Sequence, residues 1–372
     1  MNVVFAPDSF KGSLSSIEVS TTMAKAFQSA DPEVTPVIKP MADGGEGTLE
    51  ALTQAAVHEK VSLSCTGPLG EPSESWYISL SDNRAVIEGA NIAGLPLVPE
   101  EKQNPDLTTT YGIGEAIRHA LDRGGRDFII AIGGSSTNDG GLGMLQALGM
   151  KALTAGGKEA GMFGKDLFTV KKVDFSGLDE RLQEATIRIA CDVDNPLTGP
   201  RGASCVYGPQ KGATKQQVSN YDQALEAYGQ LVEKELNKEL ADVPGAGAAG
   251  GLGFAFLAMG AQLQSGARLV AEAVDLEDAI QQADLVVTGE GQSDEQTVYG
   301  KAPGYVAELA RKHGKPALLI SGSLGEDLDQ LNELFTSCFS IVQRPASLHE
   351  CIEKAEHNLY QTARQIARLI IK

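Results

Sequence analysis

Five glycine-rich polar segments in this chain combine residue types that bind phosphate groups and Mg²⁺. The first, DSFKGS, places Asp8, Ser9 and Lys11 directly after a short apolar run. A lysine in such a loop holds a phosphate or a carboxylate as a point charge. The alternative is a polar turn with a solvated lysine, and position in a loop favours the binding interpretation only modestly.

The second segment, DGGEGT, spans residues 43–48. Its glycines offer backbone amides to an anion, and Asp43 and Glu46 carry carboxylates of the kind that bind Mg²⁺. The alternative is a tight turn in which Glu46 lies at a helix N-terminus, where negative charge is favoured.

The third segment, GGSSTNDGG, follows the strongly apolar run FIIAI and precedes a helical pattern. A strand, a glycine-rich loop and a helix N-terminus in this order bind phosphates through backbone amides. In this context the segment favours a phosphate site over a flexible loop. The candidate residues are Gly133, Gly134, Ser135, Ser136, Thr137 and Asn138.

The fourth segment follows the run IRIAC and contains Asp192 and Asp194 at a predicted strand end. The pair can ligate a metal or accept a proton, or it can simply form a turn, since aspartate favours turns. The later GPQKGA motif adds Lys211 beside glycines.

The fifth segment, GEGQSD, contains Glu290 and Asp294 and leads to Gly300 and Lys301. Together the five segments supply glycines, lysines and carboxylates. Phosphoryl transfer requires this inventory, because the reaction depends on positioning and charge neutralisation more than on covalent chemistry. The sequence therefore favours a nucleotide-dependent kinase.

The elements that position these segments alternate, at both ends of the chain, between short apolar strands and helices. Strands are predicted at residues 2–6, 34–39, 284–288, 317–321 and 339–342. This alternation predicts a parallel sheet covered by helices on both faces. Ligands of such a sheet bind beyond the carboxyl ends of its strands, where the polar segments lie.

Helix starts are marked by side chains that can cap a first turn. Ser15 with Glu18, and Ser347 with Glu350, form capping-box patterns. The second of these opens a single last helix, whose apolar stripe begins at Ile352.

The middle of the chain follows a different pattern. Three strand-like runs between residues 61 and 87 predict an antiparallel meander, and a helix is predicted from about 110 to 123. We therefore expect an α/β protein in which residues 1–62 and 268–372 form a discontinuous parallel-sheet domain. Residues 63–267 form an inserted, mixed α/β domain. The site is expected in the cleft between the two domains.

Composition and charge argue against several classes of protein. The chain has 372 residues and a formal net charge of −18, which disfavours nucleic acid and anionic membranes as partners. Its five cysteines are dispersed, so we expect a reducing, cytoplasmic compartment and no disulfide framework. The start has no signal-peptide pattern, and no apolar run is long enough to cross a membrane.

Motifs of other enzyme classes are missing or incomplete. The chain has no GxxxxGK[ST] motif, and no GxGxxG follows a strand with an acidic residue about 20 positions on. SGSLG, at residues 321–325, resembles a nucleophile elbow but has serine in place of the first glycine. The histidines have no zinc-ligand spacing.

Seven motifs, in order from residue 6 to about residue 303, resemble those of the bacterial type-I glycerate kinase family. They read APDSFKGSLS, MADGGEGT, GGSSTNDGG, DVDNPLTGP, YGPQKGA, PGAGAAGGLGF and TGEGQSDEQT followed by GKAP. The resemblance implies ATP-dependent phosphorylation of D-glycerate, with 2-phosphoglycerate favoured over 3-phosphoglycerate. It also implies a flavodoxin-like domain and an insert similar to restriction-endonuclease folds.

Within this resemblance the roles of single residues are hypotheses. Lys11 would bind the substrate carboxylate or the transferring phosphoryl group, and Asp192 would accept the hydroxyl proton. The ATP phosphates would bind at Gly133 to Asn138. Which carboxylate acts as base and which bind metal stays open. The further substrate-binding candidates are Asp8, Ser9 and Lys211, and the Mg²⁺ candidates are Asp43, Glu290 and Asp294.

Three alternatives compete with a glycerate kinase. The nearest is a kinase of another small hydroxy acid or sugar acid, which would share every loop. A module that senses a phosphorylated metabolite without turnover is disfavoured, because acidic loops have little use there without Mg²⁺. A hydrolase that uses Ser9 or Ser323 lacks a histidine partner in its sequence context. Oligomeric state stays open.

Overall fold

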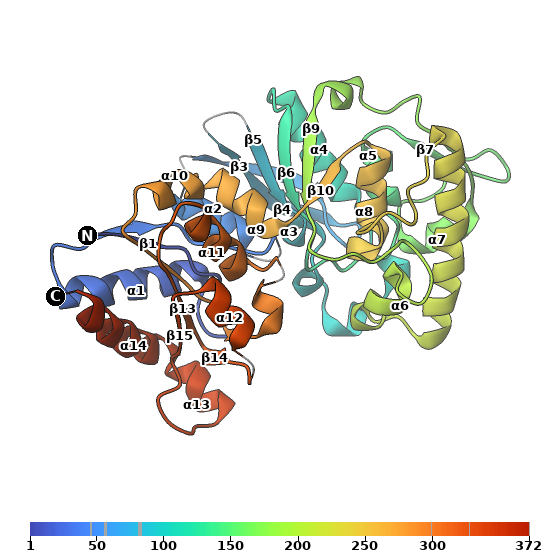
Figure 1. The fold of residues 1–372 in the computed structure, drawn as a ribbon. Helices are drawn as coiled ribbons and strands as arrows, with labels where there is room; N and C mark the ends of the chain where they lie inside the picture. The colour runs from blue at the N-terminus through green and yellow to red at the C-terminus, as the bar shows by residue number, and fades with distance from the viewer. Residues whose placement is uncertain (45–46, 56–57, 81–83, 299, 327, 372) are drawn as a thin grey trace. The chain divides into compact units, whose positions relative to one another are not determined.

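The computed structural model is shown in Figure 1, and it describes residues 1–44, 47–55, 58–80, 84–298, 300–326 and 328–371. Gly45 and Glu46 of the second glycine-rich segment lie outside these ranges. The chain divides into two compact units. Unit 1 comprises residues 1–43, 50–56 and 265–372, and unit 2 comprises residues 44–49 and 57–264.

Unit 1 contains a five-stranded sheet in which all neighbours are parallel. This confirms the parallel sheet predicted from the two ends of the chain. The order β15-β13-β11-β1-β2 changes direction between β1 and β11, and in such sheets ligands bind beyond the carboxyl ends at that point. The strands are β1 (Asn2–Phe5), β2 (Thr35–Ile38), β11 (Leu285–Thr288), β13 (Ala317–Ser321) and β15 (Ser337–Ser340).

Helices α1 (Ser16–Ala30) and α14 (Ala355–Ile370) lie side by side against this sheet in Figure 1. Their buried residues share one core with Val3 and Phe5 of β1, and the Phe5 and Phe27 rings meet edge to face at 5.2 Å. The remaining helices of unit 1 are α9 (Gly266–Ala273), α10 (Leu276–Gln281), α11 (Ala302–Lys312), α12 (Asp329–Leu334) and α13 (Leu348–Glu353). Helix α2 (Thr48–Ala55) spans the boundary between the residue ranges of the two units.

The predicted capping box at Ser15 is present at the start of α1. The amide of Glu18 donates to Ser15 Oγ at 3.3 Å, and the amide of Ser15 donates to Glu18 Oε2 at 2.8 Å. The two bonds satisfy backbone donors that the first turn of a helix leaves unpaired. The helix after the Asp8 loop therefore begins where the sequence predicted.

The single last helix predicted from the sequence is two helices in the structure. Helix α13 begins at the predicted Ser347–Glu350 capping box, and the chain leaves helical geometry at Lys354 before α14 starts. The prediction was wrong because the apolar stripe was counted from Ile352, which is 38% exposed. All residues of α13 are exposed or half-buried, so packing does not hold this helix in line with α14.

Unit 2 contains a six-stranded mixed sheet in the order β10-β9-β6-β5-β4-β3. The predicted meander is confirmed, since β3 with β4 and β4 with β5 are antiparallel. The other neighbours are parallel, so the polar segments after β6 and β9 leave the same edge of the sheet. The strands are β3 (His58–Thr66), β4 (Pro72–Leu80), β5 (Arg84–Glu88), β6 (Asp127–Ala131), β9 (Thr186–Ala190) and β10 (Gln262–Gln264).

Two short pairs of strands lie outside the main sheets. In unit 2, β7 (Lys151–Thr154) pairs antiparallel with β8 (Val170–Asp174). In unit 1, β12 (Gln292–Ser293) pairs parallel with β14 (Ser323–Leu324) and joins the loops after β11 and β13.

The helix predicted at residues 110–123 is α4 (Tyr111–Asp122), with Thr110 and Arg123 as its flanking residues. The long helix α7 (Lys215–Leu236) begins at a capping box formed by Thr214 and Gln217. The other helices of unit 2 are α3 (Ala90–Ala93), α5 (Leu142–Ala147), α6 (Ala203–Tyr207) and α8 (Ala248–Ala258). Across the part of the chain that the structure describes, no helix is both long and apolar enough to cross a membrane.

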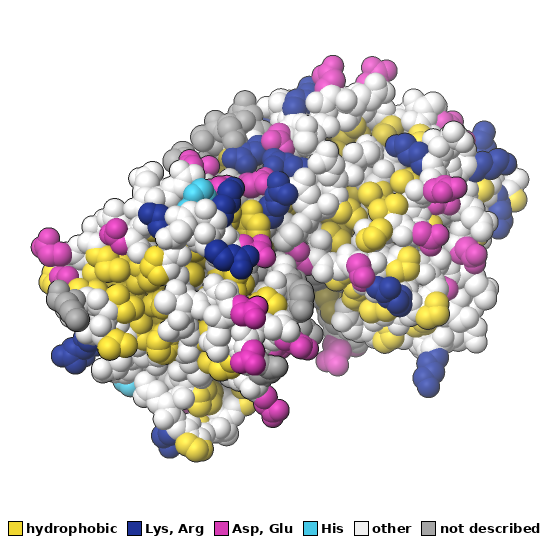
Figure 2. Space-filling model, viewed as in Figure 1, with side chains coloured by type: hydrophobic (Ala, Val, Ile, Leu, Met, Phe, Trp, Pro, Cys, Tyr) yellow, Lys and Arg dark blue, Asp and Glu magenta, His cyan; other side chains and the backbone are white. Residues whose placement is uncertain are grey.

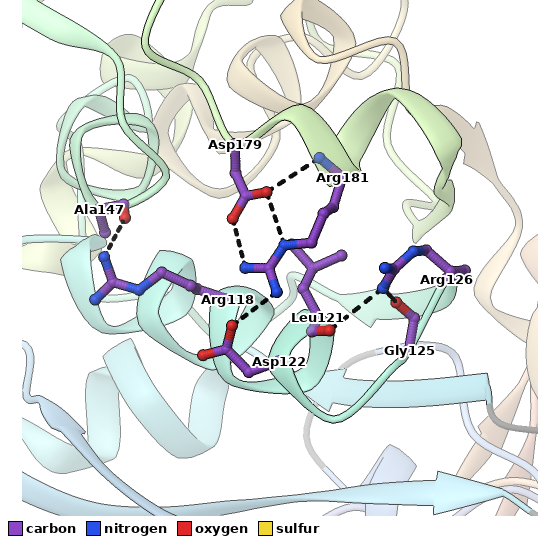
Figure 3. Close-up of polar contacts among 8 residues, drawn as sticks. All are labelled: Arg118, Leu121, Asp122, Gly125, Arg126, Ala147, Asp179 and Arg181. Atoms are coloured by element: carbon purple, nitrogen blue, oxygen red, sulfur yellow. Dashed lines mark hydrogen bonds and ion pairs between the residues drawn. The ribbon is translucent and has the colours of Figure 1, made fainter.

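Arginine side chains close the C-terminal ends of α4 and α5, as Figure 3 shows. Arg118 donates to the carbonyl of Ala147 at 3.1 Å, and Arg126 donates to the carbonyl of Leu121 at 3.3 Å. Arg181 forms ion pairs with two aspartates nearby, each at 2.7 Å. Basic side chains at a helix C-terminus donate hydrogen bonds to its unpaired carbonyls, and their positive charge interacts favourably with the negative end of the helix dipole. This polar cluster therefore stabilises the fold of unit 2.

Candidate functional site

Two of the predicted site residues, Asp8 and Glu290, lie just beyond the carboxyl ends of β1 and β11 in unit 1. The amide of Asp8 donates to the carbonyl of Gly289 at 2.8 Å, so the two loops run together. A Cβ at Gly289 would lie 1.9 Å from the carbonyl oxygen of Ile320, so only glycine fits there. Both carboxylates are 8% exposed, and they lie where the strand order changes direction.

The pKa of Asp8 is raised to about 7. Burial is the largest cause, followed by the negative charge of Asp43, and Glu290 adds to it. The amide of Ser9, which donates to Asp8 Oδ1 at 2.6 Å, and the charge of Lys11 oppose the increase. A carboxyl group with a pKa near neutrality is suited to accept a proton, which the sequence alone did not indicate for Asp8.

Lys11 and Asp43 form an ion pair, with Nζ 3.1 Å from Oδ2. The charge of Asp43 is the largest cause of the raised pKa of Lys11, so this lysine carries its proton at neutral pH. Its side chain is 77% exposed, and an ion pair in such a setting adds little stability. The exposed ammonium is accessible to an anionic ligand.

Glu290 is held in place by hydroxyl groups that the sequence did not single out. Its Oε1 accepts hydrogen bonds from Ser293 Oγ at 3.0 Å and Thr297 Oγ1 at 2.7 Å, and Ser293 Oγ lies 2.7 Å from Ser321 Oγ. Lys301 Nζ is 3.7 Å from the other carboxylate oxygen. These bonds fix the orientation of a buried carboxylate, as a ligand or a proton acceptor requires.

The acidic residues of unit 1 include the three side chains predicted to bind Mg²⁺, Asp43, Glu290 and Asp294. Burial is the main cause of the raised pKa of Asp8, and the negative charges of Asp43 and Glu290, which a cation would offset, add to it. Among the described residues, no three His, Cys, Asp or Glu side chains converge as a metal site. A Mg²⁺ ion would therefore take most of its ligands from phosphate and water, as is usual for this ion. Asp294, the third candidate, is half-buried at the start of the turn that contains Thr297.

Many cations on the face of unit 1 seen in Figure 2 lie beside acidic side chains, over α9 and α11. Arg268 pairs with Glu272 at 2.8 Å, and Lys312 pairs with Glu277 at 2.7 Å. In these two pairs the positive charge is compensated by a carboxylate. With a net charge of −18 on the chain, an anionic substrate depends on local positive charge, such as that of Lys11 or of a bound cation.

The predicted phosphate loop joins β6 to α5 in unit 2 and is largely buried. Two amides at the start of α5 donate to the carboxylate of Asp139, that of Gly141 at 3.1 Å and that of Gly143 at 3.3 Å. These two amides are therefore not open to a phosphate, and α5 has only six residues. A phosphate at this loop would instead contact residues 133–138.

Asp139 was not predicted as a site residue, although it follows Asn138 in the loop. It is fully buried and also accepts hydrogen bonds from the amide of Thr110 at 2.9 Å and from its hydroxyl at 2.7 Å. Burial raises its pKa, and these hydrogen bonds oppose the increase. Asp139 fixes the end of the loop against the start of α4.

Two polar atoms of the loop, Thr137 Oγ1 and Asn138 Oδ1, are buried and have no hydrogen-bond partner among the described residues. The amide nitrogen of the Asn138 side chain donates to Ser204 Oγ at 2.9 Å. A buried polar atom left unpaired costs about 1–3 kcal/mol, and water or a ligand usually pairs with it. The two atoms therefore favour the loop as a binding site.

The PGAGAAGGLG motif connects the loop after β6 with the loop after β9. Ala249, Gly250 and Gly251 have left-handed backbone angles. The amide of Gly140 donates to the carbonyl of Gly250 at 3.0 Å, and the amide of Gly247 donates to the carbonyl of Asn195 at 2.9 Å. The motif is thus a structural turn that contacts both loops.

Asp192 lies two residues beyond the end of β9 and is exposed at the start of the second of these loops. Asp194, two residues further on, is exposed and pairs with Arg201 at 2.7 Å. Both carboxylates are exposed, and Asp192, which is nearer to the end of β9, is the one predicted to accept a proton.

Lys211, predicted to bind substrate, is only 2% exposed. Its Nζ donates to Ser135 Oγ at 2.9 Å and to the carbonyl of Thr137 at 2.6 Å. Burial lowers the pKa of Lys211 to about 7, and the charge of Asp139 opposes this decrease. The structure thus brings Lys211 against the predicted phosphate loop, within unit 2.

The lowered pKa makes a testable prediction about stability. In the unfolded chain Lys211 has an ordinary pKa near 10.4, so between about pH 7 and 10 the unfolded chain binds an extra proton. The titration of Lys211 therefore costs no unfolding free energy above that range, and the unfolding free energy decreases as the pH falls toward 7. From pH 9.5 to pH 8, the wild type is expected to lose about 2 kcal/mol of unfolding free energy relative to Lys211→Met.

Urea unfolding of unit 2 at the two pH values measures this difference. The matched control is Lys215→Met, at an exposed position in the first turn of α7. The difference in unfolding free energy between the wild type and Lys215→Met should be the same at both pH values. If the difference between the wild type and Lys211→Met is also the same at both pH values, Lys211 does not titrate as inferred.

Comparison with known proteins assigns the chain to a family. A model of the glycerate kinase family matches residues 3–371. The glycerate kinase of Haemophilus influenzae is 44% identical, over 100% of this chain and 99% of the relative. The glycerate 2-kinase of Escherichia coli K12 is 45% identical, over 99% and 97%. The glycerate kinase of Bacillus subtilis 168 is 46% identical, over 100% and 98%.

A solved structure also matches along the whole chain. The crystal structure of the putative glycerate kinase 2 from Salmonella typhimurium LT2 superposes with a TM-score of 0.89 at 44% identity, covering 100% of this chain and 98% of the other. The match confirms a mixed α/β fold with parallel sheets.

The fold and these comparisons together define a phosphotransferase that acts on a small molecule, a kinase rather than a sensor or a hydrolase. The chain belongs to the glycerate kinase family. The resemblance found in the seven sequence motifs is thereby confirmed.

Proposed function

We propose that this enzyme transfers the terminal phosphoryl group of ATP to the 2-hydroxyl of D-glycerate with the help of Mg²⁺. The observation that carries the proposal is the pair of buried carboxylates, Asp8 and Glu290, with Lys11 nearby, at the point where the strand order of unit 1 reverses. The choice of the 2-hydroxyl is supported by the name of the E. coli relative.

In this proposal the residues of unit 1 bind the substrate and the Mg²⁺ ion. Lys11 binds the carboxylate of glycerate or the transferring phosphoryl group, and Asp8 and Ser9 contribute to the substrate site. Asp43, Glu290 and Asp294 hold Mg²⁺, directly or through water, and the ion would neutralise the charge of the phosphates. The negative charges of Asp43 and Glu290, which add to the raised pKa of Asp8, support this assignment, because a cation would offset them.

The residues of unit 2 bind ATP and accept a proton. The ATP phosphates contact residues 133–138, which is supported by the unpaired atoms Thr137 Oγ1 and Asn138 Oδ1. Asp192 takes the proton of the glycerate hydroxyl as the new bond to phosphorus forms. The expectation that the two sets of residues act together in an interdomain cleft stays a prediction.

The finer fold assignments are part of the same proposal. The parallel strand order of unit 1, counted within that unit, is 2-1-3-4-5, which is the flavodoxin-like order. Unit 1 and unit 2 correspond in this proposal to the domains 1–62 with 268–372 and 63–267. The similarity of the inserted domain to restriction endonucleases is supported by its mixed sheet only in general terms.

The proposed setting of the enzyme is the cytoplasm, with glycerate and ATP as its ligands and neither nucleic acid nor membrane as partner. All five cysteines carry free thiols, which is consistent with a reducing compartment. The net charge of −18 supports the absence of nucleic acid.

The direct test is to incubate the protein with ATP, Mg²⁺ and D-glycerate and to identify the product by ³¹P NMR. We expect 2-phosphoglycerate, with ATP consumption that requires both glycerate and Mg²⁺. A panel of other hydroxy acids and sugar acids serves as the comparison. A faster reaction with another acid would overturn the substrate, and 3-phosphoglycerate as product would overturn the assigned hydroxyl.

A further inference from the structure

A lysine buried in unit 2 approaches the predicted phosphate loop from the side of the protein interior. Lys211 ends the 3₁₀ turn Pro209–Lys211 and is 2% exposed. Burial of an amino group is costly because the group loses its hydration, so its polar atoms must be paired inside the protein. Its partners therefore indicate what the side chain does.

Both hydrogen bonds of the Lys211 amino group go to one short stretch of the loop between β6 and α5. Nζ donates to Ser135 Oγ at 2.9 Å and to the carbonyl oxygen of Thr137 at 2.6 Å. A lysine that has lost its proton still has two N–H bonds, which matches these two acceptors. The side chain thus connects a hydroxyl and a backbone carbonyl two residues apart.

The glycines of the GPQKGA motif bring Lys211 to this position. A Cβ at Gly208 would lie 2.4 Å from the carbonyl oxygen of Ser204, and a Cβ at Gly212 would lie 2.0 Å from that of Gln103. Gly212 also has a φ of +85°, which favours glycine. Both glycines are needed for close packing of the backbone around the turn.

The other end of the same loop is fixed by Asp139, which accepts hydrogen bonds from Thr110 and from the amides of Gly141 and Gly143. Between these two attachments lie the buried, unpaired atoms Thr137 Oγ1 and Asn138 Oδ1. The protein therefore fixes the loop on both sides of the atoms that are left for a ligand or water.

We propose that Lys211 is a positioning residue, which holds residues 135–137 in the conformation that binds the ATP phosphates and does not itself contact glycerate. The inference rests on the proposed function only in naming ATP as the ligand. The hydrogen bonds that it depends on belong to the protein alone.

Replacement of Lys211 by methionine tests the proposal, because methionine keeps most of the side-chain length and lacks the donors. The amide of Ser136, which donates to the carbonyl of Ala93 at 2.9 Å, is expected to exchange with solvent roughly tenfold faster in Lys211→Met. The amide of Gly140, held by Gly250 on the far side of the loop, should change little. Residue-resolved hydrogen exchange measures both rates.

Steady-state kinetics provide the second readout. In Lys211→Met the KM for ATP is expected to rise roughly tenfold, while the KM for glycerate stays within about twofold of the wild-type value. Lys215→Met, at an exposed position of α7, is the matched control and should change neither constant. An isolated rise in the KM for glycerate, with unchanged exchange of Ser136, would show that Lys211 binds substrate and would overturn the proposal.

Ser135→Ala provides a second variant in case Lys211→Met does not fold. It removes one of the two acceptors and leaves Lys211 in place, so a smaller acceleration of Ser136 exchange is expected. Unchanged exchange in a folded Ser135→Ala would also count against the proposal. Failure of glycerate phosphorylation in the wild type would refute the proposed function and leave the exchange measurements interpretable.

Discussion

Asp192→Asn is expected to lower kcat for ATP-dependent glycerate phosphorylation by about 10²-fold or more. Asparagine has nearly the shape of aspartate but cannot take the hydroxyl proton. Because the change acts on proton transfer, KM for both substrates should move much less than kcat. Asp192 is exposed two residues beyond the end of β9, so the substitution leaves the strand and its neighbours in place.

Two other aspartates make this prediction specific. Asp194→Asn is the matched control, since it changes the carboxylate two residues further along the chain, which is exposed and paired with Arg201. It should leave kcat within about twofold of the wild-type value. Asp8→Asn tests the rival assignment, because the pKa of Asp8 is raised to about 7 by burial and by Asp43.

The pattern across the three variants assigns the base. A fall in kcat for Asp192→Asn that is larger than the fall for Asp8→Asn supports Asp192. An unchanged kcat in Asp192→Asn together with a large loss in Asp8→Asn would transfer the role to Asp8. Stopped-flow or coupled-assay rates for the three variants at one pH are sufficient to decide.

Gly250→Ala is expected to destabilise unit 2 by about 3 kcal/mol or more. The Cβ would lie 2.0 Å from the carbonyl oxygen of Thr137, and the backbone at Gly250 has a φ of +73°, which alanine rarely adopts. The new Cβ is attached directly to the backbone and meets a backbone oxygen, so no side-chain rotation relieves the clash and the loop itself must move. For a unit of this size the thermal transition should fall by roughly 6–12 °C.

Gly156→Ala is the control for this second prediction. Nothing lies within 4 Å of the Cβ position at Gly156, so the same chemical change should alter stability by about 0.5 kcal/mol or less. Calorimetry of both variants provides the comparison. A Gly250→Ala variant as stable as Gly156→Ala would show that residues 249–251 do not contact the loop as closely as the structure indicates.

Much of the local structure could be predicted from the sequence because its signals are local. The capping boxes at Ser15 and Ser347, the meander from β3 to β5 and the single strands of unit 1 all follow from residues close together in the chain. The last helix shows the limit of such reasoning. Its break at Lys354 depends on where packing ends, which the apolar pattern alone does not reveal.

The candidate site, like the fold, could be predicted from the sequence only in part. The sequence indicated which loops carry chemistry, since glycines, lysines and carboxylates cluster there. It did not indicate that the carboxylate of Asp139 accepts hydrogen bonds from the amides at the start of α5. It also did not indicate that Ser321, the last residue of β13, joins the hydrogen bonds around Glu290. Those contacts join residues that the fold, and not the chain order, brings together.

The sequence by itself determined the family, the parallel sheet of unit 1 and the loops that we propose for the chemistry. Only the tertiary structure decided the environment of each side chain: Lys11 is exposed and charged, whereas Lys211 is buried with its pKa lowered to about 7. The two lysines lie in similar glycine-rich motifs, so the sequence does not distinguish them. The physical reason is that hydration and nearby charge set the state of an ionisable group, and both depend on residues distant in the chain.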